Sequence, residues 1–173
     1  MNPARETDSQ SFTQLFHEHK NHIYDFVLKM LGDKDTAADI VQDVFIRLHE
    51  HLNKKRPIDD VRNWLFIVAR NLCLNHLRRH RKQQPLDSVI DNIEHSYSTA
   101  DSRLTALRQA VGRLESPYRE GLILKVYQGF AYTEIADILG TTVPAVRAIL
   151  FKARNQLRNA LNRTQAKGDS YEL

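Results

Sequence analysis

The sequence lacks the alternating pattern of strands, the cysteines of a disulfide framework and the long apolar run of a membrane span. Its 173 residues include six glycines and one cysteine, Cys73, which excludes an intrachain disulfide and a multi-cysteine metal site. Apolar residues recur at three- and four-residue spacing, without the alternation of a strand. No apolar run reaches membrane-spanning length, and the polar start MNPARETDSQ is unlike a signal peptide. We therefore expect an all-α protein in a reducing cytoplasm, with Cys73 in a helical core.

The formal net charge of +4 is distributed unevenly along the chain. Residues between Gln83 and Asp101 are polar, mildly acidic and interrupted by Pro85, which predicts a flexible linker. Four apolar residues within it are spaced for a partner-induced helix: Leu86, Val89, Ile90 and Ile93. The predicted order is a polar tail at 1–11, a helical module at 12–82, a linker at 83–102, a second helical module at 103–163 and a polar tail at 164–173.

The stretch YTEIADILGTTVPAVRAILFKARNQL, residues 132–157, predicts a helix, a tight turn and a second helix. Gly140 is the expected left-handed residue of the turn, Thr142 the expected N-cap, and Pro144 lies in the next first turn. The predicted inner faces are Ile135, Ala136 and Leu139, then Val146, Leu150, Ala153 and Leu157. The outward face of the second helix contains no acidic residue. Its members are Ala145, Arg147, Ala148, Phe151, Lys152 and Arg154. This pattern is typical of a helix-turn-helix that enters a DNA major groove, although a purely structural helix pair remains the alternative.

The helices expected before this motif would support it from within the second module. Predicted inner positions of the first of them are Leu104, Leu107, Val111 and Leu114. The apolar residues that continue the next one are Leu122, Ile123, Val126 and Tyr127. The pair Ser116-Pro117 has the order of a cap followed by proline, so we expect a helix to start there and to end at Gly129.

The first module opens with an amphipathic segment at 12–31 that ends at Gly32. Its predicted inner residues are Phe12, Leu15, Phe16, Ile23, Phe26, Val27, Met30 and Leu31. The histidines at 17, 19 and 22 raise the question of a metal site. No thiolate or carboxylate with ligand spacing completes the set, because Glu18 is expected to point elsewhere. We expect neither a metal nor a cofactor here.

The segment DKDTAADIVQDVFIRLHEHL predicts a second helix, with Asp35 as its N-cap. Its expected buried residues are Ile40, Val41, Val44, Phe45, Leu48 and Leu52. Asp39 and Asp43 are four residues apart and share one side of the helix. Paired carboxylates can serve acid–base catalysis, but nothing else in the sequence completes such a site. A solvated face and a docking surface for a basic partner remain the alternatives.

A charged loop, NKKRPIDD, leads to a third segment, VRNWLFIVARNLCLNHLRRHRK. Its predicted inner stripe is Val61, Trp64, Leu65, Val68, Ala69, Leu72 and Leu77. Basic residues crowd its end: Arg78, Arg79, Arg81 and Lys82. The helix dipole accounts for one or two of these charges. Together with the outer Arg62, Arg70, Asn71, Asn75 and His76, the full set favours a nucleic-acid surface.

Taken in this order, the segments resemble the extracytoplasmic-function (ECF) subgroup of bacterial sigma-70 family sigma factors. DTAADIVQDVFIRLHEHL is similar to the family segment that docks on the clamp coiled coil of core RNA polymerase. NWLFIVARNLCLNHLRRHRK is similar to its promoter −10 helix, and AVGRLESPYREGLILKVYQGFAYTEIADILGTTVPAVRAILFKAR to its −35 domain. The resemblance covers nearly all of residues 12–161, and it lacks the intervening third domain of larger sigma factors.

The resemblance implies a non-enzymatic initiation factor that binds core RNA polymerase and promoter DNA, inserts in no membrane and answers to an anti-sigma factor. The implied polymerase-binding residues are Asp39, Gln42, Asp43 and Arg47. The implied −10 residues, where the family captures an extruded base, are Asn63, Trp64, Arg70, Asn71, Asn75, Arg78 and Arg79. The implied −35 residues are Thr142, Ala145, Arg147, Ala148, Phe151 and Lys152.

This chain departs from the family in its −35 helix. Many members have Lys-Ser-Arg where this chain has Arg147-Ala148-Ile149, and a basic residue or histidine where it has Phe151. We therefore expect Arg147 to make most direct base contacts, with DNA shape and phosphate contacts supplying much of the rest.

Two other classes of protein have to be weighed. A two-component or quorum-sensing regulator would use the same helix-turn-helix without polymerase, but the first module lacks an evident phosphoacceptor or ligand pocket. A small metal-dependent nuclease would use Asp39 and Asp43 or the N-terminal histidines, and metal-dependent cleavage would distinguish it.

Overall fold

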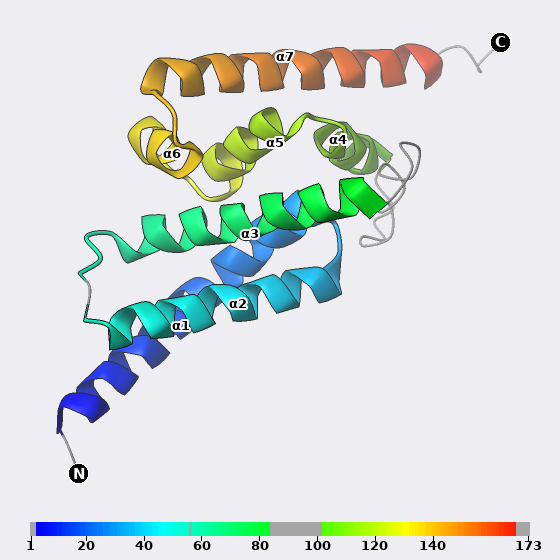
Figure 1. Cartoon of the computed structure of the whole chain (residues 1–173). Helices are drawn as coiled ribbons and strands as arrows, with labels where there is room; N and C mark the ends of the chain where they lie inside the picture. The colour runs from blue at the N-terminus through cyan, green and yellow to red at the C-terminus, as the bar shows by residue number, and fades with distance from the viewer. Residues whose placement is uncertain (1–2, 56, 84–101, 169–173) are drawn as a thin grey trace. The chain divides into compact units, whose positions relative to one another are not determined.

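The computed structural model describes residues 3–55, 57–83 and 102–168, and every regular element in these ranges is helical (Figure 1). The elements are α1 (Pro3–Leu31), α2 (Lys34–Asn53), α3 (Val61–Gln83), α4 (Ser102–Gly112), α5 (Ser116–Leu122), the π-helical η2 (Ile123–Tyr127), α6 (Tyr132–Leu139) and α7 (Val143–Gly168). The all-α prediction is thus confirmed for the described residues. The chain divides after Gln83 into unit 1, which holds α1 to α3, and unit 2, which holds α4 to α7.

The predicted linker falls almost wholly outside the described residues. Gln83 is the last residue of α3 and Ser102 the first of α4. The expected partner-induced helix around Leu86, Val89, Ile90 and Ile93 lies between them, and so outside the description.

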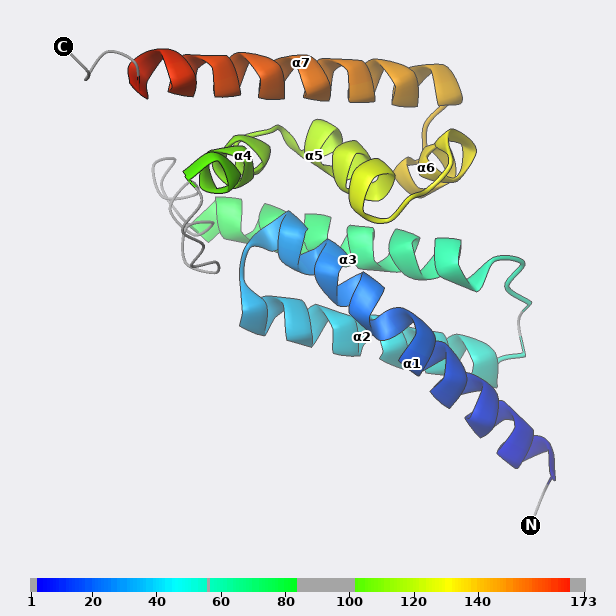
Figure 2. The ribbon, with the colours of Figure 1, turned by 180° about the vertical axis from the view of Figure 1, so that it is seen from behind.

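Unit 1 is a bundle in which α2 and α3 lie side by side in opposite directions and α1 crosses both (Figures 1 and 2). Each helix contributes one apolar face to a shared core. Phe26 of α1 and Phe66 of α3 meet edge to face, with ring centroids 5.3 Å apart, a favourable arrangement for two aromatic rings. The buried set is Ile23, Phe26, Val27, Leu28, Met30, Ala37, Ile40, Val44, Phe45, Leu48, Leu65, Phe66, Ala69 and Cys73, so the placement of Cys73 in the core is confirmed.

Several expectations for unit 1 need correction. Helix α1 starts at Pro3 rather than at Phe12, and its first apolar residues, including Phe12 and Phe16, are only half-buried. On α3 the predicted stripe omitted Phe66, which is fully buried, whereas Trp64 is half-buried. The reason is that α3 packs against both α1 and α2, which buries a wider face than a single stripe.

The start of α2 also differs from the prediction. Its N-cap is Asp33, not Asp35, because Gly32 turns the chain with a φ of 77° and leaves Asp33 extended. The Asp33 carboxylate accepts a hydrogen bond from the Thr36 backbone N–H at 2.7 Å. Hydrogen bonds from Thr36 lower the pKa of Asp33, and the one from its side chain has a larger effect than the one from its backbone.

Unit 2 is organised around α7, against which α4, α5 and α6 all pack. The turn from α4 to α5 is held by Arg119, whose guanidinium donates to the carbonyls of Gly112 at 2.6 Å and Leu114 at 2.9 Å. Ser116 hydrogen bonds Glu120, which is buried. The predicted Ser116 cap is wrong by one residue, because Glu115 is the N-cap and Ser116 lies in the first turn before Pro117.

The α5 segment continues as a helix to Tyr127, with Gln128 as its C-cap directly before Gly129 as predicted, but its last turn is not α-helical. Residues 123–127 form one π-helical turn, which is wider than an α-turn and rotates the following side chains around the axis. As a result Leu124 is fully buried, whereas Val126 and Tyr127 are exposed. The chain is then returned toward α6 by Gly129, with a φ of 71°, and by a hydrogen bond from Lys125 Nζ to the Phe130 carbonyl at 3.0 Å.

The helix-turn-helix follows the prediction closely. Gly140 has a left-handed φ of 64°, and Thr142 accepts a hydrogen bond from the Ala145 backbone N–H at 3.4 Å. On α6, Ile135 and Ala136 are buried as expected, but Ile138 is buried and Leu139 only half-buried. On α7, Val146, Leu150 and Ala153 are buried, and Leu157 packs partly buried against the core.

Helices α5 and α7 approach each other closely at Gly121, and this contact fixes the position of α7 against α5. A Cβ atom at Gly121 would lie 2.9 Å from Ile149 Cγ2, so Gly121→Ala must displace α7 or α5. Such overpacking costs about 1–3 kcal/mol, more than the roughly 1 kcal/mol that alanine gains in helix propensity.

We expect faster amide hydrogen exchange in α5 and α7 of Gly121→Ala. Adding Ile149→Leu, which removes the obstructing methyl group, should restore protection, and unchanged exchange in the single variant would contradict this packing argument.

Candidate functional site

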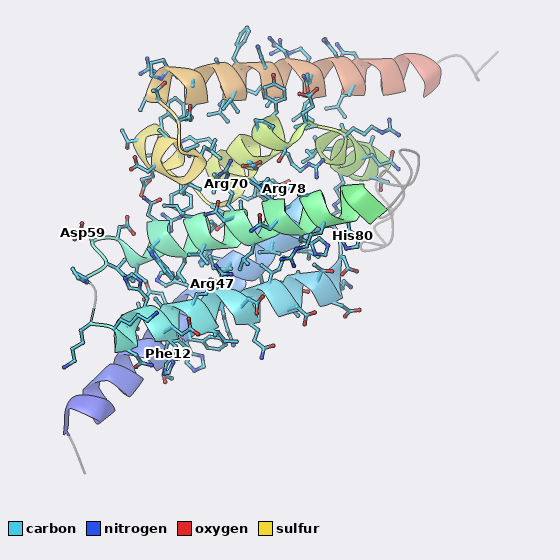
Figure 3. All side chains as sticks on the ribbon, in the orientation of Figure 1. Phe12, Arg47, Asp59, Arg70, Arg78 and His80 are labelled. Carbon is cyan, nitrogen blue, oxygen red and sulfur yellow. The ribbon has the colours of Figure 1, made fainter. Side chains whose placement is uncertain are left out.

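The four residues expected to bind polymerase all lie exposed on α2. Asp39, Asp43 and Arg47 follow one another at four-residue intervals and therefore form a row along the helix. Gln42 lies beside this row, followed one turn later by Ile46, which is 47% exposed. The face thus combines two carboxylates, an amide and an exposed apolar side chain. Figure 3 labels Arg47 at its end.

An apolar groove adjoins this face, between α1 and α2. It has a volume of about 520 Å³ and is lined by Phe12, Phe16, Ala38, Val41, Gln42, Phe45, Ile46 and His49. The Phe16 and Phe45 rings meet edge to face at 4.8 Å, and Lys20 Nζ lies 5.5 Å from the Phe16 ring centroid. Gln42 and Ile46 belong to both the groove and the α2 face, so the two form one continuous surface.

The structure offers no support for a metal centre in this region. Among the residues that it describes, no group of three histidine, cysteine, aspartate or glutamate side chains is placed to hold a metal ion. Glu18 was expected to point away from the N-terminal histidines, but its Oε1 lies 3.9 Å from His19 Nε2.

The residues expected at the −10 element all lie on α3. Asn71, Asn75, Arg78 and Arg79 are exposed, whereas Asn63, Trp64 and Arg70 are half-buried. Arg70 and Arg78 are labelled on α3 in Figure 3. The side chains of Arg81 and Lys82, which complete the basic run in the sequence, lie outside the described part. The described residues still form a polar and basic surface over more than half the length of α3.

A polar corner marks the start of α3. Asp60 caps the helix by accepting the Asn63 backbone N–H at 2.9 Å, and the His51 and Trp64 rings lie 5.2 Å apart. His51 Nε2 and Asn63 Oδ1 are buried and have no hydrogen-bond partner. A buried polar atom without a partner costs about 1–3 kcal/mol, so the corner retains unused hydrogen-bonding capacity. No sequence pattern links His51 to Trp64, because the contact forms only when α2 and α3 pack.

The surroundings of two histidines of unit 1 lower their pKa values. Burial is the largest influence on His19 and lowers its pKa below the usual 6.5, although Glu18 opposes this shift. Burial also lowers the pKa of His76, with help from His80, whose ring centroid is 4.3 Å away, and against the attraction of Asp33.

The residues expected at the −35 element lie at the start of α7, on the side away from its buried stripe. Thr142, Arg147, Ala148, Phe151 and Lys152 are exposed, and Ala145 is half-buried. Phe151 is 65% exposed, more than the other large apolar side chains that stand out on the described surface. Arg154 is also exposed, and no acidic residue occurs between Thr142 and Arg158.

Comparison with known proteins gives this arrangement a family. The family model for sigma-70 region 2 matches residues 15–83, and the family model for sigma-70 region 4 matches residues 104–157. The chain belongs to the ECF group of sigma-70 family sigma factors. It is therefore a factor for promoter-specific transcription initiation by RNA polymerase and not an enzyme.

Curated relatives and solved structures agree with this assignment. The chain is 27% identical over 155 residues to the ECF RNA polymerase sigma factor SigM of Bacillus subtilis, covering 87% of this chain and 94% of SigM. It is 26% identical over 173 residues to SigW of the same organism, covering 91% and 92%. The fold resembles that of the sigma factor RpoE from Bartonella quintana, solved with the anti-sigma factor NepR, with a TM-score of 0.71, 21% identity and coverage of 88% and 98%.

No described helix is both long enough and apolar enough to cross a membrane.

The lowered pKa of His19 predicts how unit 1 responds to acid. The folded state disfavours the protonated form of this imidazole, so the unfolded state binds more protons as the pH falls. The free energy of unfolding that neutral His19 contributes is therefore fully present above pH 6.5. It is lost as the pH falls through the folded-state pKa. Urea unfolding followed by fluorescence of Trp64, the single tryptophan, should show a steeper loss between pH 7 and pH 5 for the wild type than for His19→Gln. Adding His76→Gln should flatten the dependence further. Equal slopes in all three proteins would contradict this explanation.

Proposed function

We propose that this sigma factor divides its work between the two units. Residues 12–82 act as sigma region 2, which binds core RNA polymerase and recognises and melts the −10 element. Residues 103–163 act as sigma region 4, which recognises the −35 element. The observation that supports this division best is that most of the candidate residues in each of the three groups are exposed, on α2, on α3 and at the start of α7. The segment 83–102 would serve as the linker, with polar tails at 1–11 and 164–173.

On α2, we assign polymerase binding to Asp39, Gln42, Asp43 and Arg47. The carboxylates supply charge for a basic partner, and Ile46 with the adjoining groove supplies apolar surface that gains free energy when covered. A protein interface typically needs both, a desolvated apolar centre and a polar rim. The partner in the family is the clamp coiled coil of core RNA polymerase.

On α3, we assign −10 recognition to Asn63, Trp64, Arg70, Asn71, Asn75, Arg78 and Arg79. The arginines and asparagines can contact phosphates and base edges, and the Trp64 indole offers a stacking surface. An extruded base would enter beside the polar corner of His51 and Asn63, whose unpartnered atoms could accept or donate hydrogen bonds after local opening. Such contacts offset the few kcal/mol that unstacking costs.

On α7, we assign −35 recognition to Thr142, Ala145, Arg147, Ala148, Phe151 and Lys152. A helix-turn-helix places the first residues of its second helix against base edges in the major groove, and these residues run from Thr142, just before α7, to Lys152 in its third turn. The absence of acidic residues on this part of α7 suits the negative potential of DNA.

We further propose an anti-sigma partner and a cytoplasmic location, where core polymerase and promoter DNA are found. The similar structure of RpoE from B. quintana was solved with the anti-sigma factor NepR. The similar structure of CnrH, with a TM-score of 0.68 and 23% identity, was solved with the cytosolic domain of CnrY. An inhibitor that covers the apolar groove of unit 1 would compete directly with polymerase.

Charge reversal at Asp43 tests the polymerase surface. Asp43 is exposed on α2, so Asp43→Arg should leave unit 1 folded while placing a positive charge against a basic partner. We expect binding to core RNA polymerase, measured by fluorescence anisotropy of the labelled chain, to weaken at least tenfold, or about 1.4 kcal/mol.

The matched control is Asp25→Arg, which makes the same change in charge at an exposed position of α1 away from the groove. It should bind polymerase with nearly wild-type affinity. A folded Asp43→Arg variant with unchanged affinity would remove this face of α2 from the docking site.

A further inference from the structure

The outward face of α7 has an apolar centre, which is unusual for a surface that meets DNA. Ala148 lies two residues after buried Val146 and two before buried Leu150, about 200° around the helix from each. It therefore sits opposite the core. Neighbouring positions one turn away belong to Ala145, Phe151 and Lys152. The middle of this face is therefore apolar, and Phe151 adds an exposed phenyl ring to it beside the charged Lys152.

Phe151 is not explained by packing within unit 2. It is 65% exposed, while the core of this part of the unit is completed by Val146, Leu150 and Ala153. Exposed phenylalanine is common on protein surfaces when it stands alone. Here it lies one turn from Arg147 and next to Lys152 in the sequence, inside a basic surface that suits DNA.

The chemistry of this face limits what it can recognise in a base pair. Alanine and phenylalanine side chains neither donate nor accept hydrogen bonds, so they cannot distinguish guanine, cytosine or adenine through polar edges. The apolar group that the major groove presents is the thymine C5-methyl, which alanine and phenylalanine contact favourably. The small Ala145 and Ala148 side chains also let the backbone of α7 approach the groove closely.

We propose that Phe151, with Ala148 and Ala145 beside it, recognises thymine C5-methyl groups in the −35 element by apolar contact. This inference rests on the −35 role proposed above and adds the basis of its specificity. Arg147 and Lys152 flank the apolar centre and hold the helix on the phosphates or on an adjacent base. Discrimination at one or two positions then follows from burying a methyl group against Phe151.

Replacing thymine by uracil tests the inference, because the two bases differ in the groove only by this methyl group. The holoenzyme, assembled from the full chain and core RNA polymerase, first selects its preferred duplexes from a random-sequence pool. The selected −35 element is then synthesised with each thymine, on either strand, changed singly to uracil. For the wild type we expect uracil at one or two positions to raise the Kd about three- to fivefold, the effect of losing one buried methyl group.

Two variants separate methyl recognition from general DNA affinity. Phe151→Ala should bind the thymine duplex more weakly and should no longer distinguish thymine from uracil at those positions. Lys152→Ala, a matched control on the same face, should weaken binding to every duplex alike and keep the distinction. Both residues are exposed, so both variants should fold, which circular dichroism can verify.

The outcomes distinguish this inference from the proposed function. If uracil is tolerated throughout a selected −35 element, if that element contains no thymine on either strand, or if Phe151→Ala keeps the distinction, methyl recognition is wrong and the −35 role stands. If the holoenzyme selects no duplex sequence at all, the −35 role fails and the inference with it.

Discussion

The burial of one apolar side of each helix is the constraint on which the rest of this protein depends. In unit 2 the stripe of Val146, Leu150 and Ala153 holds α7 against α5 and α6, and this decides which side chains of α7 remain exposed. The close contact at Gly121 and the left-handed turn at Gly140 fix where α7 lies against its supports. A shift at either point would change the orientation of Ala148 and Phe151 without touching them.

Unit 1 obeys the same constraint with a different result. Apolar residues of α3 pack against both α1 and α2, and this leaves the basic and amide side chains of α3 on its remaining side. On α1 and α2 the core does not cover everything: Phe12, Phe16 and Ile46 line a groove that stays open. Open apolar surface next to Asp39 and Asp43 is costly for a free protein and useful for one that works in an assembly.

Much of this was predictable from the sequence, because helical spacing specifies both the buried and the exposed side of an isolated helix. The helix-turn-helix, the left-handed Gly140 and the exposure of Asp39 and Asp43 follow from spacing and turn chemistry alone. Other features depend on contacts between helices. The π-turn that exposes Val126 and Tyr127, the buried Phe66 and the His51–Trp64 corner have no local signature, since each arises only when separate segments pack. The N-cap at Asp33 was missed because two aspartates lie near the turn and only the backbone of Gly32 selects between them.

The central claim is that the two units together direct core RNA polymerase to promoters. Run-off transcription with purified core polymerase, this protein and a pooled library of genomic fragments tests it most directly. The account predicts specific transcripts that require the protein, with two shared sequence elements at a constant spacing upstream of their start sites. Strong binding to duplex DNA at physiological salt without any protein-dependent transcript would contradict the claim and indicate a conventional DNA-binding regulator.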